Sequence, residues 1–371
     1  MLKHIEEYRD SKLCGQLIKR IKRCSSTEVR LMEVCGTHTV SIFRNGIRTI
    51  LPESLSLLSG PGCPVCVTAQ RDIDAFIELS KRKDVIVATF GDLMRVPGTY
   101  SSLQRERANG ADIRVVYSAF DALVVAQKHP DKKVVFLGVG FETTAPTVAA
   151  AVLLAKKQDI RNFLVFSALK LVVPALEALV STPTLNIDGF MLPGHVSVVI
   201  GTKAYRGFFE HHQLPCVVAG FEPVDILHAI SLLVEQSAHQ QPRLENAYER
   251  AVKFEGNLKA QETMEKVFEA TEVPWRGLGA LPASGLKIKE TFKALDAAEA
   301  LELDVSYSKE PKGCGCGDIL RGLKQPTECP LFSTACNPAH PIGPCMVSSE
   351  GTCAAYFRYQ RIQPGGSRSE E

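Results

Sequence analysis

Cysteines are the residues of this chain best suited to chemistry, and their distribution is uneven. The 371 residues include 12 cysteines. Thiols in a reducing compartment more often bind metal or do redox work than form structural disulfides. Three cysteines stand alone and are expected to be ordinary buried thiols: Cys14, Cys24 and Cys216. The others form an N-terminal and a C-terminal group: Cys35, Cys63 and Cys66, then Cys314, Cys316, Cys329, Cys336, Cys345 and Cys353.

The C-terminal group resembles the ligand set of a metal cluster. Its compact core is Cys329-x6-Cys336-x8-Cys345-x7-Cys353, and a [4Fe–4S] cluster requires four thiolates. The alternatives are zinc held by four cysteines and a pair of disulfides. Zinc sites usually present paired C-x2–4-C knuckles, so the even spacing favours iron–sulfur. Cys316 is a fifth candidate ligand, and the sequence leaves open which four bind.

A second candidate site is the segment Cys35-Gly36-Thr37-His38-Thr39, which follows an apolar run. Thiolate suits iron, copper or zinc, and imidazole suits iron and zinc, while Gly36 allows a sharp turn between the two side chains. The segment therefore indicates a mononuclear metal site whose open positions are filled by a partner or by exogenous ligands. The alternative is a strand-end turn with a buried cysteine and a hydrogen-bonded histidine.

Cys63-Pro64-Val65-Cys66 is a C-x-x-C sequence followed at once by a helical pattern. Thiols at a helix N-terminus have a lowered pKa and are more readily ionised. Three interpretations remain: a redox dithiol, half of a metal site, or a structural loop. A second C-x-x-C nearby is absent from the sequence, which weakens the case for a zinc ribbon.

Polar residues also follow later apolar runs. Glu142, Thr143 and Thr144 either exchange protons with a ligand or cap the next helix. His195, in Pro193-Gly194-His195-Val196-Ser197, belongs either to the same site or to a structural turn. Ligands of open α/β sheets bind beyond the carboxyl ends of the strands. We therefore expect these motifs to meet in one crevice.

Apolar runs that alternate with helical patterns predict the elements that position these motifs. Continuous apolar strands are typical of parallel sheets covered on both faces, and repeated strand–helix units indicate a doubly wound α/β fold. The predicted strands occupy residues 29–34, 54–60, 84–90, 113–118, 133–139, 162–168, 188–194 and 215–221. Residues 138–144 and 218–224 both carry Gly-Phe-Glu after an apolar run, which is either an internal repeat or coincidence.

We predict an N-terminal helix (1–25), two doubly wound, Rossmann-like α/β domains (26–130 and 131–242) and a small Cys-rich iron–sulfur domain (243–371). The polar stretch Lys-His-Pro-Asp-Lys-Lys sets the division near residue 130. Residues 243–310 are expected to mix helical segments with an irregular stretch. The Gly-, Pro- and Cys-rich part after residue 310 cannot build a large apolar core and needs a metal or disulfide staple.

The composition argues against two classes of partner. A net charge of +2 and the absence of a basic run with interleaved aromatics give no support to a nucleic-acid role. No stretch of about 18 uncharged apolar residues is present, and the N-terminus lacks the apolar core of a signal peptide. The chain is therefore expected to stay in the cytoplasm, with no membrane contact.

These motifs, in this order, resemble those of the hydrogenase maturation HypD family. The resemblance spans the whole chain and rests on Cys35–Thr39, Gly62–Cys66, Gly140–Thr144, Pro193–Ser197, Cys316-Gly317-Asp318 and Gly343–Ser348. It implies a protein that helps to build the Fe(CN)2CO group of [NiFe] hydrogenase. It further implies a small HypC-type partner that shares the iron and a HypE-type partner that delivers cyanide. The expected cofactors are a [4Fe–4S] cluster and the iron under assembly.

The resemblance also assigns roles to residues. Cys35 would bind iron with His38 beside it, and Cys63 with Cys66 would pass electrons between the cluster and the iron. Glu142, Thr144 and His195 would line the crevice. The protein would then be a redox-active maturation scaffold rather than a conventional turnover enzyme. The alternative function is a cluster-dependent thiol–disulfide oxidoreductase in which only Cys63 and Cys66 react.

Overall fold

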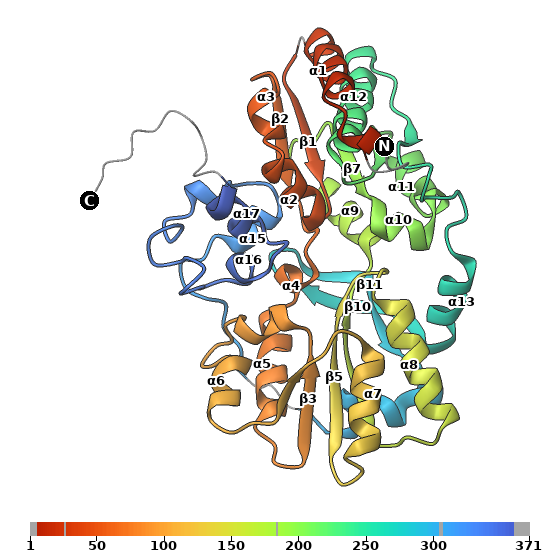
Figure 1. The fold of residues 1–371 in the computed structure, drawn as a ribbon, viewed down its shortest axis with the longest axis vertical. Helices are drawn as coiled ribbons and strands as arrows, with labels where there is room; N and C mark the ends of the chain where they lie inside the picture. The colour runs from red at the N-terminus through yellow and green to blue at the C-terminus, as the bar shows by residue number, and fades with distance from the viewer. Residues whose placement is uncertain (1–5, 26, 183–184, 304–306, 360–371) are drawn as a thin grey trace.

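The computed structural model describes residues 6–25, 27–182, 185–303 and 307–359, and it has two lobes with a third segment on one flank (Figure 1). The fold class expected from the sequence is confirmed: two parallel sheets, each covered by helices, and a Cys-rich C-terminal region. Residues 1–5 of the predicted N-terminal helix, and 360–371 at the end of the predicted iron–sulfur domain, lie outside the described residues. The described N-terminal part forms η1 (Glu6–Arg9) and α1 (Ser11–Cys24).

The first lobe is built on a five-stranded parallel sheet in the order β2-β1-β7-β8-β9. Its strands are β1 (Val29–Glu33), β2 (Leu55–Ser59), β7 (Gly189–Pro193), β8 (Cys216–Ala219) and β9 (Leu244–Asn246). Helices α1 and α12 pack against each other in this lobe. The helices of the lobe besides α1 are α2 (Gly36–Arg44), α3 (Ile47–Ile50), α9 (Val172–Val180), α10 (Gly194–Ile200), η3 (Thr202–Tyr205), α11 (Arg206–His212) and α12 (Pro223–His239).

The second lobe is built on a four-stranded parallel sheet in the order β4-β3-β5-β6. Every residue of β3 is buried, as is every residue of β5 after the first, as expected for strands with helices on both faces. The strands are β3 (Val85–Thr89), β4 (Ile113–Val115), β5 (Lys133–Gly140) and β6 (Phe163–Leu169). The helices are α4 (Pro64–Val67), α5 (Gln70–Ser80), η2 (Gly91–Arg95), α6 (Leu103–Ala108), α7 (Ala119–Lys128) and α8 (Ala145–Lys157).

The sheets do not follow the division predicted near residue 130. Strands β3 and β4, before that point, pair with β5 and β6, after it, while β1 and β2 share a sheet with β7. The chain leaves the first sheet after β2 and returns to it only at β7. The polar stretch at 128–133 is a short exposed connection between α7 and β5, and such a connection is polar whether or not a domain ends there.

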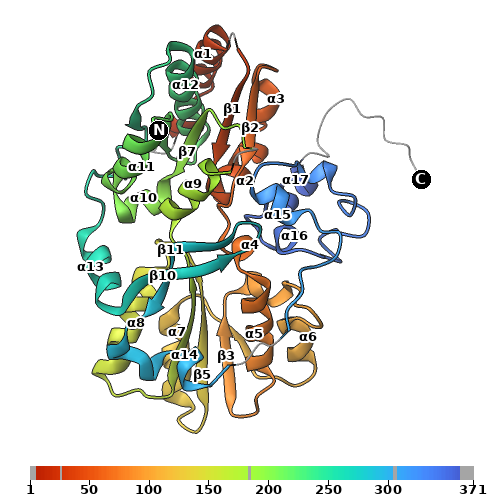
Figure 2. The same cartoon turned by 180° about the vertical axis from the view of Figure 1, so that it is seen from behind.

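A second difference lies between the lobes. Residues 268–288, expected to be partly irregular, form an antiparallel hairpin of β10 (Phe268–Trp275) and β11 (Gly279–Ile288). The tight turn uses positive φ angles at Gly277 (80°) and Gly279 (77°), which glycine adopts without steric cost. Trp275 bridges to Thr68 next to α4. Figure 2 shows the hairpin lying between the two lobes.

The C-terminal segment has little regular structure and lies on one flank, beside both lobes (Figure 1). It contains α15 (Cys316–Leu320), η5 (Pro326–Glu328), α16 (Pro344–Val347) and α17 (Thr352–Tyr359). The remaining helices before it are α13 (Leu258–Val267), η4 (Glu290–Leu295) and α14 (Ala297–Ala300). Within the described ranges, no helix has both the length and the apolar character needed to cross a bilayer.

The loops that follow β1 and β2 approach so closely that Gly62 has no room for a side chain. A Cβ at Gly62 would lie 2.3 Å from the backbone nitrogen of Cys35. We expect Gly62→Ala to lower the free energy of unfolding by about 1–3 kcal/mol, because the backbone must shift. The control is Gly15→Ala in α1, where nothing lies within 4 Å and removing a helical glycine should add ~1 kcal/mol. Urea melts that rank the two variants in the opposite order would contradict this packing.

Candidate metal and redox site

The two N-terminal cysteine motifs lie side by side. They follow neighbouring parallel strands, β1 and β2, so their loops emerge at the same edge of the sheet. The Gly36 N–H donates a hydrogen bond to the carbonyl oxygen of Gly62, with an N–O distance of 3.1 Å. This bond holds the turn after Cys35 against the turn before Cys63. The structure therefore brings together two motifs that are far apart in the sequence.

Cys35 is a buried thiol at the N-cap position of α2. Burial raises its pKa to about 12, and the nearby Glu350 carboxylate acts in the same direction, while the N–H groups of Thr37 and His38 oppose both effects. Glu350 belongs to the C-terminal segment and accepts a hydrogen bond from the Thr37 hydroxyl, with an O–O distance of 2.7 Å. The thiol is thus protonated at neutral pH, and a cation that displaces its proton would gain a soft ligand.

His38 is fully buried, and its tautomer follows from its neighbours. Nε2 lies 2.9 Å from the carbonyl oxygen of Gly220 and 3.2 Å from that of Ala219. Carbonyl oxygens only accept hydrogen bonds, so Nε2 carries the proton. Nδ1 then keeps its lone pair, and it has no hydrogen-bond partner in the described structure. Metal-binding histidines commonly have this arrangement, with one nitrogen fixed by a carbonyl and the other free.

Aromatic stacking connects His38 to His195, the second residue of α10, which follows β7. The ring of Phe221 stacks on His38 at a centroid distance of 4.7 Å and on His195 at 3.9 Å. His195 is exposed, whereas His38 is buried. Partial removal from water lowers the pKa of His195, so both imidazoles favour the neutral form. His195 therefore lies at the solvent side of the group that includes the predicted metal ligand His38.

Cys63 and Cys66 form a disulfide with a Cα–Cα distance of 5.2 Å. Cys63 is the N-cap residue of α4, and both cysteines are buried, with 3% and 0% of their surface exposed. Helix α4 packs against α15 and α16, which carry Cys316 and Cys345. All four sulfur-bearing residues belong to one continuous hydrophobic core. The disulfide thus lies between the Cys35 loop and the C-terminal cysteines.

The C-terminal cysteines surround one small cavity. Its walls contain the six cysteines predicted as a cluster group, together with Ile319, Leu331, Phe332 and Met346. Cys316 Sγ lies 2.9 Å from Cys345 Sγ. Hydrogen bonds from Cys314 and Cys345 lower the pKa of Cys316, and the Arg276 guanidinium adds to this effect. Burial raises the pKa of Cys336.

This donor set fits a cluster better than a single ion. Among the described residues, no three His, Cys, Asp or Glu side chains converge closely enough to hold one metal ion. Each thiolate of a [4Fe–4S] cluster binds a different iron, so its ligands surround the cluster and need not meet at a point. The apolar cavity walls also supply no oxygen or imidazole ligands. The six thiols around one cavity are therefore compatible with a cluster, and four of them would suffice.

Glu142 is buried two residues after the end of β5, and Thr144 is the N-cap residue of α8. One Glu142 oxygen accepts a hydrogen bond from the Val172 N–H at 3.0 Å, and the other has no partner in the described structure. Burial raises the Glu142 pKa to about 7, a value suited to proton transfer near neutral pH. Thr144 is half-buried, makes no side-chain cap and packs on Gly140, so nothing described places its hydroxyl in the site.

Three neighbours of the site were absent from the sequence predictions. Tyr205 is fully buried, 3.0 Å from the Ser197 hydroxyl, and both Glu142 and Cys35 act on its pKa, which burial raises. Phe221 belongs to the second Gly-Phe-Glu segment, so the internal repeat was the signal that could have identified it. Glu350 lacks any distinguishing sequence pattern, because its role depends on the docking of the C-terminal segment.

Because His38 is buried, the stability of the folded protein should depend on pH. Its pKa in the folded state is lowered to about 4 by burial, while an unfolded histidine titrates near ~6.5. Between these values the unfolded chain binds the extra proton, so stability falls as the pH falls. Between pH 7 and pH 5, the free energy of unfolding of the metal-free wild-type protein should fall by about 2 kcal/mol more than that of His38→Gln. Urea titration followed by Trp275 fluorescence measures both values. His340→Gln, at an exposed histidine, should retain the wild-type loss, and equal losses in all three proteins would contradict the assignment.

Comparisons with known proteins identify the family of this chain. A family model described as "HypD: Hydrogenase formation hypA family" matches residues 12–360. The chain is 45% identical over 376 residues to the hydrogenase maturation factor HypD of Cupriavidus necator, covering 98% of each chain. It is 45% identical over 369 residues to that of Azotobacter vinelandii, covering 97% of each. It is 42% identical over 368 residues to that of Escherichia coli, covering 97% of this chain and 99% of the relative. The chain belongs to the HypD family.

Proposed function

We propose that this protein acts in hydrogenase maturation, as a scaffold and redox factor on which the Fe(CN)2CO group is assembled. The relatives named above are hydrogenase maturation factors. The observation that carries the proposal is the contact between the Cys35 loop and the Cys63–Cys66 loop, at 3.1 Å between Gly36 N and Gly62 O. The Cys35 thiol, which would be a soft metal ligand, thus lies beside a disulfide that would take up two electrons.

Cys35 and His38 would capture the iron. The thiol proton leaves as the metal binds, and the unpaired Nδ1 of His38 supplies a neutral donor without losing a hydrogen bond. Two protein ligands leave positions open for cyanide, carbon monoxide and a donor from another protein. We infer that a HypC-type partner shares the iron and that a HypE-type partner delivers cyanide. The open side is next to exposed His195.

Cys63 and Cys66 would exchange electrons with the assembly site. Reduction of their disulfide consumes two electrons and two protons and yields two thiols. The C-terminal cavity would hold a [4Fe–4S] cluster through four of its six cysteines, and such a cluster supplies electrons one at a time. Glu142, with a pKa of about 7, is suited to donate or accept a proton nearby. Ten of the cysteines are free thiols, which suits a reducing cytoplasm.

The alternative function, a general thiol–disulfide oxidoreductase, is less well supported. Such an enzyme needs one sulfur that a partner thiol or disulfide can reach. Cys63 and Cys66 are 3% and 0% exposed. They face the interior of the protein, where the neighbours are the Cys35 loop and the C-terminal cysteines. The burial of Cys63 and Cys66 suits electron transfer between groups inside the protein better than reaction of these sulfurs with the disulfide of another protein.

Replacing Cys35 separates the two functions. Cys35→Ala should abolish stoichiometric iron capture at the N-terminal site and association with the HypC-type partner, because the thiolate ligand is lost. Dithiol turnover of Cys63 and Cys66 should survive. The control Cys14→Ala removes a half-buried thiol on α1 and should change neither property. Iron analysis and co-purification measure the outcome, and normal iron binding by Cys35→Ala would sink the scaffold proposal.

The cluster assignment is tested separately. Anaerobically purified protein should show a broad absorbance near ~400 nm from sulfur-to-iron charge transfer. Cys345→Ala should lose most of it, since this thiol is buried in the cavity wall, whereas Cys216→Ala should retain it. Metal analysis that finds stoichiometric zinc and no iron in the wild-type protein would rule out this part of the proposal.

A further inference from the structure

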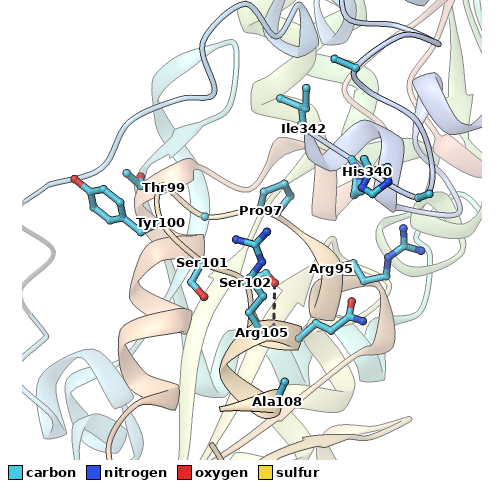
Figure 3. Close-up of a pocket in the computed structure, with 15 residues that line it drawn as sticks. Arg95, Pro97, Thr99, Tyr100, Ser101, Ser102, Arg105, Ala108, His340 and Ile342 are labelled. Carbon is cyan, nitrogen blue, oxygen red and sulfur yellow. Dashed lines mark hydrogen bonds between the residues drawn. The ribbon is translucent and has the colours of Figure 1, made fainter.

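Two hollows on the outer surface of the C-terminal segment share the residue Arg95. The larger has a volume of about 590 Å³ and lies between the region of η2 and α6 and the loop 335–342. Figure 3 shows the Arg95 and Arg105 side chains at this hollow, with His340 and Ile342 above them. The smaller hollow, about 400 Å³, is lined by Arg95, α16 and α17. We name the two together the Arg95 surface.

The Arg95 surface lies directly outside the cysteine cavity. Met346 lines both the smaller hollow and the cysteine cavity. Ile342 lines the larger hollow, and its backbone N–H donates a hydrogen bond to Cys336 Sγ at 3.3 Å. One layer of residues therefore separates this surface from the thiols that would hold a cluster. No residue of the Cys35 loop lines either hollow.

The Arg95 surface is also basic. Arg95, Arg105, Arg358 and His340 line it, and no aspartate or glutamate lines either hollow. The three arginines form no salt bridge with any described residue. Arg95 donates a hydrogen bond to the Pro338 carbonyl, which fixes its position. Positive charge is thus concentrated on this surface, although the net charge of the whole chain is only +2. Guanidinium groups that have no carboxylate partner within the chain favour carboxylates of another molecule.

We propose that the Arg95 surface is the docking site of an acidic one-electron carrier protein that reduces the cluster. The proposal rests on the function proposed above, which requires an external reductant for the Cys63–Cys66 disulfide. Two donor molecules are oxidised by one electron each, and a cluster held by the cavity thiols would relay these electrons to the disulfide. The disulfide takes up both electrons and two protons and becomes two thiols. The donor thus binds at a surface that contains no residue of the Cys35 loop.

The distribution of the charges favours a protein over a small anion. The cationic groups are spread over two hollows on either side of Arg95, so one small anion would contact only part of them. Tyr100, 78% exposed at the rim of the larger hollow, and half-buried Phe357 in the smaller add apolar contact area. Aromatic and arginine side chains together are typical of the energetic centres of protein interfaces.

The test uses full-length, cluster-loaded protein and two probes: a plant-type [2Fe–2S] ferredoxin, which is acidic, and cytochrome c, which is basic. Titration calorimetry under anaerobic conditions measures binding at low and high salt. The double variant Arg105→Glu, Arg358→Glu should weaken ferredoxin binding at low salt by about tenfold or more, and high salt should weaken wild-type binding. The control, Lys128→Glu, Lys157→Glu, makes the same change in net charge on α7 and α8 and should bind like wild type.

A second measurement follows the disulfide. Alkylation and mass spectrometry count the thiols of Cys63 and Cys66 after treatment with reduced ferredoxin or with dithionite. The double variant should slow the ferredoxin reaction and leave the dithionite reaction unchanged. Equal ferredoxin binding by all variants, preference for cytochrome c, or saturation by inorganic phosphate alone would overturn the docking proposal. Absence of the absorbance near ~400 nm in the wild-type protein would instead refute the cluster function, so the two failures are distinguishable.

Discussion

The site depends on the close contact between two glycine-containing turns. Gly36 donates a backbone hydrogen bond to Gly62, and a side chain at either position would collide with its surroundings: Cys35 in the case of Gly62 and Glu350 in the case of Gly36. Parallel pairing of β1 and β2 brings the turns to one edge, and the absence of Cβ atoms then allows backbone contact. Helix α4 begins two residues after Gly62 and packs on α15 and α16, so this contact also fixes where the C-terminal cysteines meet the disulfide.

Burial determines the protonation state of the site. The same removal from water raises the pKa of Cys35 to about 12 and that of Glu142 to about 7, and lowers that of His38 to about 4. All three groups therefore favour their neutral forms. The neutral Cys35 and His38 side chains offer a metal ion no charge until the thiol proton leaves. The site therefore favours a metal ion that displaces the Cys35 proton and forms a metal–sulfur bond. Nδ1 of His38 and one carboxyl oxygen of Glu142 have no hydrogen-bond partner in the described structure and are available to such an ion.

The sequence predicted the local elements better than their connections. All eight predicted strands are present as β1–β8, because a buried parallel strand is a continuous apolar run. The division at residue 130 failed, since strand order depends on pairing partners such as Leu31 with Gly189 that leave no local pattern. The adjacency of Cys35 and Cys63 followed from the general rule for strand ends. Tyr205 and Glu350 could not be predicted, because only packing brings them to the site.

The passage of the chain between the sheets has a consequence for biosynthesis. The four-stranded sheet uses one uninterrupted stretch, from β3 to β6, while the five-stranded sheet has β1 and β2 on one side of that stretch and β7 to β9 on the other. During translation the four-stranded sheet can close while β1 and β2 still lack their partner β7. The Cys35 and Cys63–Cys66 loops, which follow β1 and β2, therefore cannot reach their final positions until β7 has been synthesised. Until residue 193 has left the ribosome, the nascent chain exposes two apolar strands.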